Sequence, residues 1–548
     1  MRLPERKPPR SRLLLTCALL LLGALPAAGA TLAERLAALP DHAPPVVRGE
    51  DLVALAMLPR IYAATGNQLL WREPARRTAL IAAIRDSFDD GLVPRDYHLA
   101  ALEALPAGDD PDPDDDLLAT DAYAMLVFHL ALGKVDAVKL EPNWSLALSS
   151  ARQRAAFEAI VTALSGGRIR ETATEARPHH YLYERGRAAL ARYRQLAADG
   201  GWEPLPPGDR LGPGMSDPRV PALRRRLAAE GDLALAGGTT SYDAPVAAAV
   251  RGFQHRHGLP ADGAVGEATR RALNVPLEAR IDALRLNLER GRWVLGDIGE
   301  GDLVVVDIAG YGVRYVRDRQ VIWRGRAIVG RRYRQTPVFR AVVDDIVLNP
   351  TWTVPPGILA KDVLPAMRRG EDALGHKHLA VLDRADRPVD PATIDWSRLD
   401  GAHFPYVLRQ AAGEANALGR VKINFANPYS VYLHDTPSRE LFDRDERAFS
   451  SGCIRIDRPV ELAALVLGDA AHWNPAALQA AIDTGTTRAI PVRRHVSILI
   501  MYWTAEVDAD GQVTFRRDLY GRDARLLRAL DHHPAAGDHG RENRPPPA

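Results

Sequence analysis

At positions 432–437 the chain reads Tyr-Leu-His-Asp-Thr-Pro, and at positions 450–455 it reads Ser-Ser-Gly-Cys-Ile-Arg. The second segment contains Cys453, one of only two cysteines among 548 residues. The other, Cys17, lies in a segment that has the pattern of a removed signal peptide, described below. Cys453 is therefore expected to be the sole thiol of the mature protein. A lone exported cysteine calls for a functional reason.

The residues around Cys453 suit nucleophilic catalysis. A thiol becomes reactive when a nearby imidazole takes its proton and backbone N–H groups await the oxyanion that forms on the attacked carbonyl. His434 can be the base, and the amides of Gly452 and Cys453 can be the N–H donors. Gly452 also lets the backbone turn tightly beside a substrate. Either the Asp435 carboxylate or a backbone carbonyl can orient the imidazole, and the sequence leaves this open.

The residues after the cysteine predict its place in the fold. Residues 454–456 alternate like the end of a strand. Asp457 and Pro459 then have the positions of an N-cap and a first helical turn. The nucleophile is thus expected on a turn between a strand and a helix.

These segments resemble the motif of the L,D-transpeptidases of bacterial cell-wall synthesis. That motif is a histidine, a spacer of just under twenty residues, then Ser/Thr-x-Gly-Cys-apolar-Arg or Asn. Here His434 and Cys453 are 19 positions apart, and every fixed element is present. Ser451 stands where many smaller members carry a second histidine, whereas large multidomain Gram-negative members commonly read Ser-Ser-Gly-Cys. The alternative, a buried structural cysteine beside a core histidine, leaves the Ser-Ser-Gly and the exported thiol unexplained.

The start of the chain resembles an export signal. Basic residues precede an apolar run at 13–25, and Ala28-Gly29-Ala30 supplies a cleavage signal. Residues 1–30 are therefore predicted to be a signal peptide, and the protein to be periplasmic; an uncleaved segment anchored in the inner membrane is left open. No later stretch approaches the roughly 20 apolar residues of a membrane span. With 71 Lys+Arg against 69 Asp+Glu, nothing suggests a nucleic-acid partner.

The length implies three or four domains. Residues 31–205 look helical and resemble the scaffold domain of the large transpeptidases. The acidic run at 109–116 contains prolines and lacks the glycine of a calcium loop, so a solvated loop is expected there. Residues 213–276 resemble a small three-helix peptidoglycan-binding domain, in which Leu223/Leu227 and Val250/Phe253 have the spacing of core residues. A helical spacer without affinity for glycan is the alternative.

Residues 300–525 are expected to form the catalytic domain. Alternating segments at 303–308, 313–316, 320–323 and 326–330 predict consecutive strands. The resemblance implies a mainly β L,D-transpeptidase domain in which residues 355–420 form a helical capping insertion, so the predicted fold class is multidomain α+β. The segment 531–548 is rich in Pro, Gly, His and charge and is predicted to be disordered. No metal site is expected.

The resemblance also implies the reaction. Cys453 attacks a tetrapeptide donor stem of peptidoglycan, D-Ala leaves, and the amine of a diaminopimelate acceptor stem resolves the thioester into a 3→3 cross-link, in support of cell-wall biogenesis and cell shape. No cofactor is needed, and carbapenem-type β-lactams are expected inhibitors. Two alternatives remain: an L,D-carboxypeptidase or endopeptidase that uses the same Cys-His pair, and a non-catalytic peptidoglycan-binding scaffold.

Four further residues are candidates for substrate binding. Tyr432 lies two positions before His434 and can line the donor pocket or serve as a structural aromatic. Ser451 can replace the second histidine, and Arg455 can hold a stem carboxylate or brace the turn. Trp352, at the entrance to the insertion, is a candidate for substrate contact. The sequence leaves open the acceptor, the glycan affinity of the middle domain and the oligomeric state.

Overall fold

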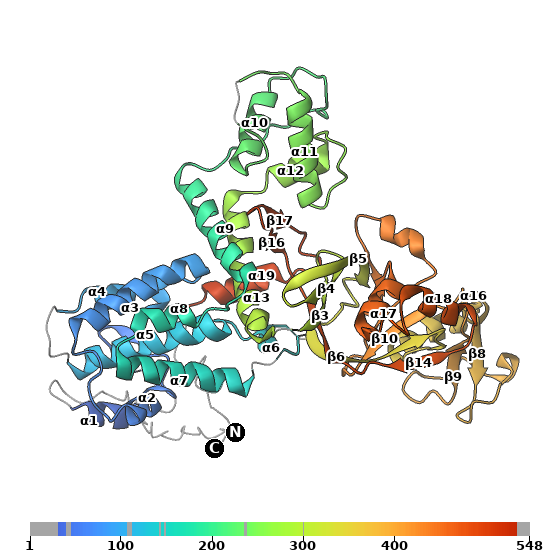
Figure 1. Ribbon diagram of the computed structural model, residues 1–548, viewed down its shortest axis with the longest axis horizontal. Coiled ribbons are helices and arrows are strands. Elements are labelled where there is room, and N and C mark those ends of the chain that lie inside the picture. The colour runs from blue at the N-terminus through green and yellow to red at the C-terminus, as the bar shows by residue number, and fades with distance from the viewer. Residues whose placement is uncertain are drawn as a thin grey trace, which may run out of the picture.

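The computed structural model describes residues 31–39, 45–106, 112–141, 144–146, 149–234, 238–299 and 301–533. The predicted signal peptide and Cys17 lie outside these ranges. Within them, no helix is long and apolar enough to cross a membrane. Figure 1 shows a helical body at the N-terminal end, a small helical unit that projects from it, and a sheet body with an insertion at its far end. The described chain is therefore multidomain α+β, as predicted.

The N-terminal body is built around one long helix, α5, which is buried on nearly all sides. The other helices of this body lie around it (Figure 1), and strand β1 of a two-stranded ribbon also contacts it. The elements are α1 Leu32–Ala37, β1 Val46–Val47, β2 Glu50–Asp51, α2 Leu58–Ala64, α3 Pro74–Asp86, α4 Leu99–Glu103, α5 Pro113–Leu132, α6 Ala137–Leu140, α7 Ser150–Gly166, α8 Ile169–Glu175 and α9 Tyr181–Ala198.

The solvated loop predicted at 109–116 is wrong for the described part of that run. Asp112 caps α5, and the acidic residues after it occupy the first turn, where the helix dipole favours negative charge. Asp116 is buried and accepts hydrogen bonds from the Tyr62 hydroxyl at 2.6 Å and from the N–H groups of Leu70 and Trp71 at 2.8 Å each. Burial raises the pKa of Asp116 to about 6. Through these hydrogen bonds to Asp116, the acidic run connects residues 62–71 to the central helix.

The small helical unit has its own hydrophobic core. Its helices are α10 Val220–Ala229, α11 Ala244–Arg256 and α12 Glu267–Leu273. Leu223, Leu227, Val250 and Phe253 are all buried in this core, which confirms the helical spacing predicted for them. Leu205 belongs to the same core, so its packing extends back beyond the predicted boundary at 213.

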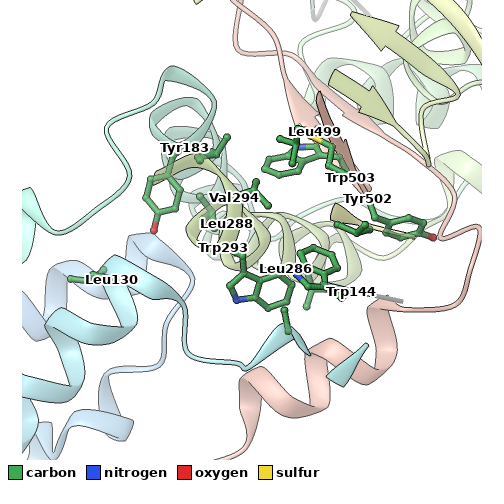
Figure 2. Close-up of a cluster of buried hydrophobic side chains, with 14 of the residues drawn as sticks. Leu130, Trp144, Tyr183, Leu286, Leu288, Trp293, Val294, Leu499, Tyr502 and Trp503 are labelled. Carbon is green, nitrogen blue, oxygen red and sulfur yellow. The ribbon is translucent and has the colours of Figure 1, made fainter. Parts of the chain in front are cut away.

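Helix α13, Leu277–Val294, joins the N-terminal body to the sheet body. It packs against α9 on one side and against the C-terminal elements β16 and α19 on another. Figure 2 shows its Leu286, Leu288, Trp293 and Val294 in one cluster with side chains from both bodies. Those other side chains are Leu130, Trp144, Tyr183, Leu499, Tyr502 and Trp503. The predicted scaffold and catalytic regions therefore share a continuous core.

The sheet body is a nearly closed ring of strands. The order is β10-β11-β13-β5-β4-β3-β15-β6-β14, and a further pairing of β10 with β6 closes the ring. The elements are β3 Asp302–Asp307, β4 Gly312–Arg317, β5 Gln320–Gly330, β6 Phe339–Leu348, β10 Val421–Phe425, β11 Leu433–His434, β12 Ala448–Ser450, β13 Ile454–Ile456, α17 Pro459–Leu467, α18 Pro475–Asp483, β14 Arg488–Pro491 and β15 Val496–Met501.

Two local predictions in the sheet body need correction. The segments 320–323 and 326–330 form the single strand β5, because its register with β4 continues through Arg324 and Gly325. The N-cap of α17 is Arg458, and Asp457 makes no cap. The Asp457 carboxylate instead accepts hydrogen bonds from the backbone and side chain of Arg326, both at 3.0 Å.

The insertion between β6 and β10 is a compact unit with a hydrophobic core of its own, centred on Val363, Leu364 and Leu408. Besides the predicted helices it contains a three-stranded sheet of order β7-β9-β8, which the sequence did not indicate. Its elements are β7 Trp352–Thr353, α14 Pro356–Ile358, a π-helical turn Leu359–Val363, α15 Leu364–Arg368, α16 Ala373–His376, β8 Leu379–Leu382 and β9 Val407–Gln410.

The C-terminal elements return to the N-terminal body (Figure 1). They are β16 Ala505–Val507, β17 Val513–Phe515 and α19 Asp523–Asp531. The disorder predicted from Asp531 onward is wrong for residues 531–533: Asp531 accepts a hydrogen bond from Arg285 at 2.5 Å, and Lys134 Nζ donates to the carbonyls of Leu530 and His532 at 2.7 and 2.8 Å. Residues 534–548 lie outside the described ranges.

Candidate active site

Strand pairing brings the two motif segments together. Strands β11 and β13 are parallel neighbours, with Leu433 beside Ile454, and the Ile454 N–H donates to the Tyr432 carbonyl at 3.1 Å. His434 ends β11, and Cys453 directly precedes β13. Cys453 thus lies on a turn between two strands, β12 and β13, so the predicted turn between a strand and a helix is wrong; helix α17 begins only after β13.

Six of the seven predicted site residues line one cavity of about 970 Å³ between the sheet body and the insertion. These are Trp352, Tyr432, His434, Ser451, Cys453 and Arg455. The seventh, Gly452, forms the turn behind the cysteine.

The turn itself is held by Ser450 and Gly452. Gly452 has a φ of +121°, which a residue with a side chain rarely adopts. The Ser450 hydroxyl donates to the Cys453 carbonyl at 2.6 Å and accepts from the Gly452 N–H at 3.1 Å. The Gly452 amide is therefore already occupied. The Cys453 N–H has no acceptor among the residues described, which makes it the better candidate for an oxyanion donor.

Two residues that sequence reasoning missed brace this turn from behind. The Thr336 hydroxyl donates to the Gly452 carbonyl and accepts from the Gly330 N–H, both at 2.9 Å. The Tyr520 hydroxyl donates to the Gly330 carbonyl at 2.8 Å and accepts from the Thr336 N–H at 3.1 Å. Neither residue carried a signal that linked it to the cysteine, because Thr336 lies 117 positions before Cys453 and Tyr520 lies 67 positions after it.

His434 is buried and is oriented by a backbone carbonyl. Its Nδ1–H donates to the Asp435 carbonyl oxygen at 2.5 Å, which leaves the Nε2 lone pair to act as a base. The Asp435 carboxylate instead accepts hydrogen bonds from the Arg420 N–H at 2.9 Å and from the Arg439 guanidinium at 2.8 Å. Of the two orienting groups that the sequence left open, the structure thus selects the carbonyl.

The imidazole is neutral at neutral pH. Burial lowers the pKa of His434 to about 3, and the positive charges of Arg455 and Lys422 act in the same direction. A neutral imidazole can accept a proton, as a general base must.

Cys453 is half-buried, and its thiol is 3.8 Å from the Ser430 carbonyl oxygen. Within the described chain no hydrogen bond joins the thiol to His434, although both line the cavity; such contacts often tighten only when substrate binds. Burial raises the pKa of the Cys453 thiol, while hydrogen bonds from Tyr432 and the charges of Lys422 and Arg455 oppose that rise. The net effect is a pKa of the Cys453 thiol above that of an ordinary cysteine.

Lys422 is a functional candidate that sequence reasoning missed. It lies on β10 opposite His434, and its ammonium is 4.3 Å from the centre of the Tyr432 ring. Burial lowers the pKa of Lys422, and the Cys453 thiolate would raise it. The sequence did contain a signal for Lys422, because lysine is rare in this chain: only six of its 71 Lys and Arg residues are lysines.

Alkylation of Cys453 by iodoacetamide should accelerate with pH over a range above that of an ordinary cysteine. The reason is that the thiolate reacts, and burial raises the pKa of this thiol. Lys422→Met should move the profile further toward high pH, because it removes a charge that favours the thiolate. Lys422→Arg, which keeps the charge, is the matched control. The alkylation rate at each pH is measured by mass spectrometry. Coincident pH profiles for wild type and Lys422→Met would contradict the assignment of Lys422 as a charge that favours the thiolate.

The remaining predicted residues occupy different walls of the cavity. The Arg455 guanidinium makes no hydrogen bond or ion pair with any residue described, and its Nε is buried. Trp352 is buried at the start of the insertion, where it lines the cavity together with Tyr432. The Ser451 hydroxyl accepts a hydrogen bond from Arg334 Nη1 at 3.0 Å. Arg334 also forms a bidentate ion pair with Asp362 of the insertion, in which both nitrogen–oxygen distances are 2.6 Å.

Three regions of the chain match known family models. Residues 301–492 match an L,D-transpeptidase catalytic domain, residues 56–190 match a scaffold domain, and residues 216–273 match a domain described as "Putative peptidoglycan binding domain". A curated protein of Haemophilus influenzae named "Putative L,D-transpeptidase" is 36% identical over 243 residues, which are 44% of this chain and 48% of that protein. The chain therefore spans about half the length of this relative.

Two solved structures also align with the chain. An L,D-transpeptidase of Xylanimonas cellulosilytica is 15% identical, with 54% of this chain and 99% of that chain covered and a TM-score of 0.17. An L,D-transpeptidase of Stackebrandtia nassauensis is 13% identical, with 55% and 97% covered and a TM-score of 0.21. These scores are too low to carry an argument.

Proposed function

We propose that this chain is an L,D-transpeptidase that forms 3→3 cross-links in peptidoglycan through a thioester on Cys453, which the match of residues 301–492 to an L,D-transpeptidase catalytic domain supports. The observation that carries the proposal is that the only cysteine among the described residues and the neutral, carbonyl-oriented imidazole of His434 line one cavity. The match of residues 216–273 to a putative peptidoglycan binding domain supports peptidoglycan as the substrate, and this geometry supports the assignment of the nucleophile and the base.

In the first half-reaction, His434 Nε2 takes the thiol proton as Cys453 Sγ attacks the carbonyl between the third residue of a tetrapeptide stem and its terminal D-Ala. The oxyanion that forms accepts a hydrogen bond from the Cys453 N–H. When the carbon–nitrogen bond breaks, His434 returns its proton to the departing amine of D-Ala. The acyl group remains on sulfur as a thioester.

In the second half-reaction, the side-chain amine of a diaminopimelate residue on another stem attacks the thioester. The amine loses a proton to His434, the carbon–sulfur bond breaks, and the sulfur takes that proton to restore the thiol. The new amide is the 3→3 cross-link. No ATP is consumed, because the energy of the broken amide is carried by the thioester.

The other predicted residues receive roles that agree with their surroundings. Arg455 is proposed to hold a stem carboxylate, since its guanidinium makes no hydrogen bond or ion pair in the described chain. Tyr432 and Trp352 are proposed to line the donor pocket. Ser451 is proposed to position Arg334, and Gly452 to permit the turn.

The proposal extends to the whole chain. We assign residues 31–205 to a scaffold, 213–276 to peptidoglycan binding and 300–525 to catalysis, with 355–420 as the cap, in a periplasmic enzyme exported by residues 1–30. Carbapenem-type β-lactams are proposed to acylate Cys453, because they present a reactive carbonyl to the same nucleophile.

Incubation with a disaccharide-tetrapeptide tests the reaction. We expect release of D-Ala together with a 3→3 linked dimer, identified by mass spectrometry of the products. Tripeptide without dimer would instead establish an L,D-carboxypeptidase, in which water replaces the amine. Absence of both products, from folded protein with a reduced thiol, would contradict catalysis and leave a peptidoglycan-binding scaffold.

A further inference from the structure

The insertion contributes a positively charged wall to the active-site cavity. Lys361 and Lys377 from the insertion line it, together with Arg331 from the sheet body. Asp362 is the only acidic residue among the described residues that line the cavity, and both of its carboxylate oxygens are engaged by Arg334. Lys361 and Lys377 form no ion pair or side-chain hydrogen bond with any residue in the described ranges. The cavity therefore offers uncompensated positive charge to a ligand.

Lysine is the exception in this chain. Only six of the 71 Lys and Arg residues are lysines, yet Lys361 and Lys377 both line this cavity and Lys422 lies beside the Tyr432 ring within it. A lysine ammonium is a compact charge on a flexible stem, whereas an arginine presents a rigid planar fork. Three of the six lysines in a chain that otherwise uses arginine therefore lie at or beside this one site.

A chain of contacts fixes the wall relative to the nucleophile. Lys361 precedes Asp362 in the π-helical turn, a distortion that occurs frequently at functional sites. Asp362 is bound by Arg334, and Arg334 also donates to Ser451, two residues before Cys453. The insertion is thereby held at the loop that carries Cys453, and Lys361 lines the cavity beside it.

We propose that Lys361 and Lys377 form the acceptor subsite and bind the free carboxylate that lies beside the attacking amine. The inference rests on the proposed function. In diaminopimelate the free amine and the free carboxylate are attached to the same carbon, so a carboxylate held by the insertion brings the amine to the thioester on Cys453. Such positioning is what favours an amine over water as the acceptor.

The same charges favour the reactive form of the amine. Only the neutral amine can attack a thioester, and an ammonium ion in a cationic cavity is destabilised by the like charges around it. The wall therefore binds one end of the acceptor and promotes loss of a proton from the other.

The test separates acceptor use from thioester formation. The donor is a disaccharide-tetrapeptide, and the acceptor is either D-methionine, which has an amine and a carboxylate on one carbon, or D-methioninamide, which lacks the carboxylate. For Lys361→Gln/Lys377→Gln we expect the apparent KM for D-methionine to rise about tenfold to a hundredfold, as loss of charge-assisted hydrogen bonds predicts. Use of D-methioninamide should fall far less, because only the effect of the lysines on the amine proton applies to it, and the single-turnover rate of D-Ala release should not change.

Arg384→Gln is the matched control, because Arg384 is an exposed cation on the insertion that does not line the cavity. It should leave both acceptors unaffected. Raising the ionic strength should raise the KM for D-methionine in wild type and have little effect in the double variant.

The outcomes are distinguishable. An unchanged KM for D-methionine, with normal release of D-Ala, would overturn the acceptor subsite and leave the proposed function intact. A parallel fall in D-Ala release would also overturn it, because the lysines would then serve the donor. If wild type releases no D-Ala, the proposed function fails, and the subsite fails with it.

Discussion

Cys453→Ala is expected to form no covalent adduct with a carbapenem or with a disaccharide-tetrapeptide, whereas wild type gains the mass of one acyl group. The side chain at 453 supplies the only thiol in the described part of the chain, so its removal leaves the cavity without a comparable nucleophile. The rate of D-Ala release should fall on the order of 10⁴-fold or more, as when nucleophiles are removed from other acyl-transfer enzymes. Intact-mass spectrometry and D-Ala assays measure both effects.

Cys453→Ser is the matched control for shape. The hydroxyl fills nearly the same space but is a far weaker acid than the thiol, so acylation should be very slow while the fold is kept. Thermal midpoints of both variants should remain close to wild type, since the side chain is only half-buried. An adduct of normal yield on Cys453→Ala would move the nucleophile elsewhere, with the Ser451 hydroxyl as the first residue to examine.

Arg292→Ala should lower the free energy of unfolding by about 3–5 kcal/mol, the range found when one partner of a buried ion pair is removed. The Arg292 guanidinium is fully buried and is bound by Glu289, by the Asp90 carbonyl at 2.8 Å and by the Tyr183 hydroxyl at 2.8 Å. Its loss leaves the Glu289 carboxylate without a counterion inside the core that α13 shares with both bodies (Figure 2). Urea denaturation followed by circular dichroism gives the measurement.

The exposed pair of Arg398 and Asp395 supplies the control. Arg398→Ala should change stability by no more than about 1 kcal/mol, because solvent screens a surface ion pair. The shared core also predicts that the scaffold and catalytic regions unfold in one transition, in wild type and in Arg292→Ala alike. Two separated transitions for these regions, or an Arg292→Ala protein as stable as wild type, would contradict this account.

Local patterns predicted a large part of the fold. The described part of residues 31–205 is mainly helical, as predicted, and the long helices α5 and α9 lie within it. That prediction succeeds because helical periodicity depends on neighbours three and four positions away. The acidic run at 109–116 was mispredicted for the opposite reason. Whether Asp116 meets water or a cluster of N–H groups depends on residues 62–71, which only the tertiary fold brings to it.

For the candidate site, the sequence determined the family motif, the spacing of His434 and Cys453, and the glycine that the turn requires. Those features are local, or are carried by a pattern long enough to be specific. Only the tertiary structure decided that a backbone carbonyl orients His434, that Ser450 occupies the Gly452 amide, and that Lys422 lies beside the site. Strand register and ring closure set these contacts. Strands β10, β11 and β13 pair although they are separated in sequence, and local periodicity carries no information about which strands pair or in which register.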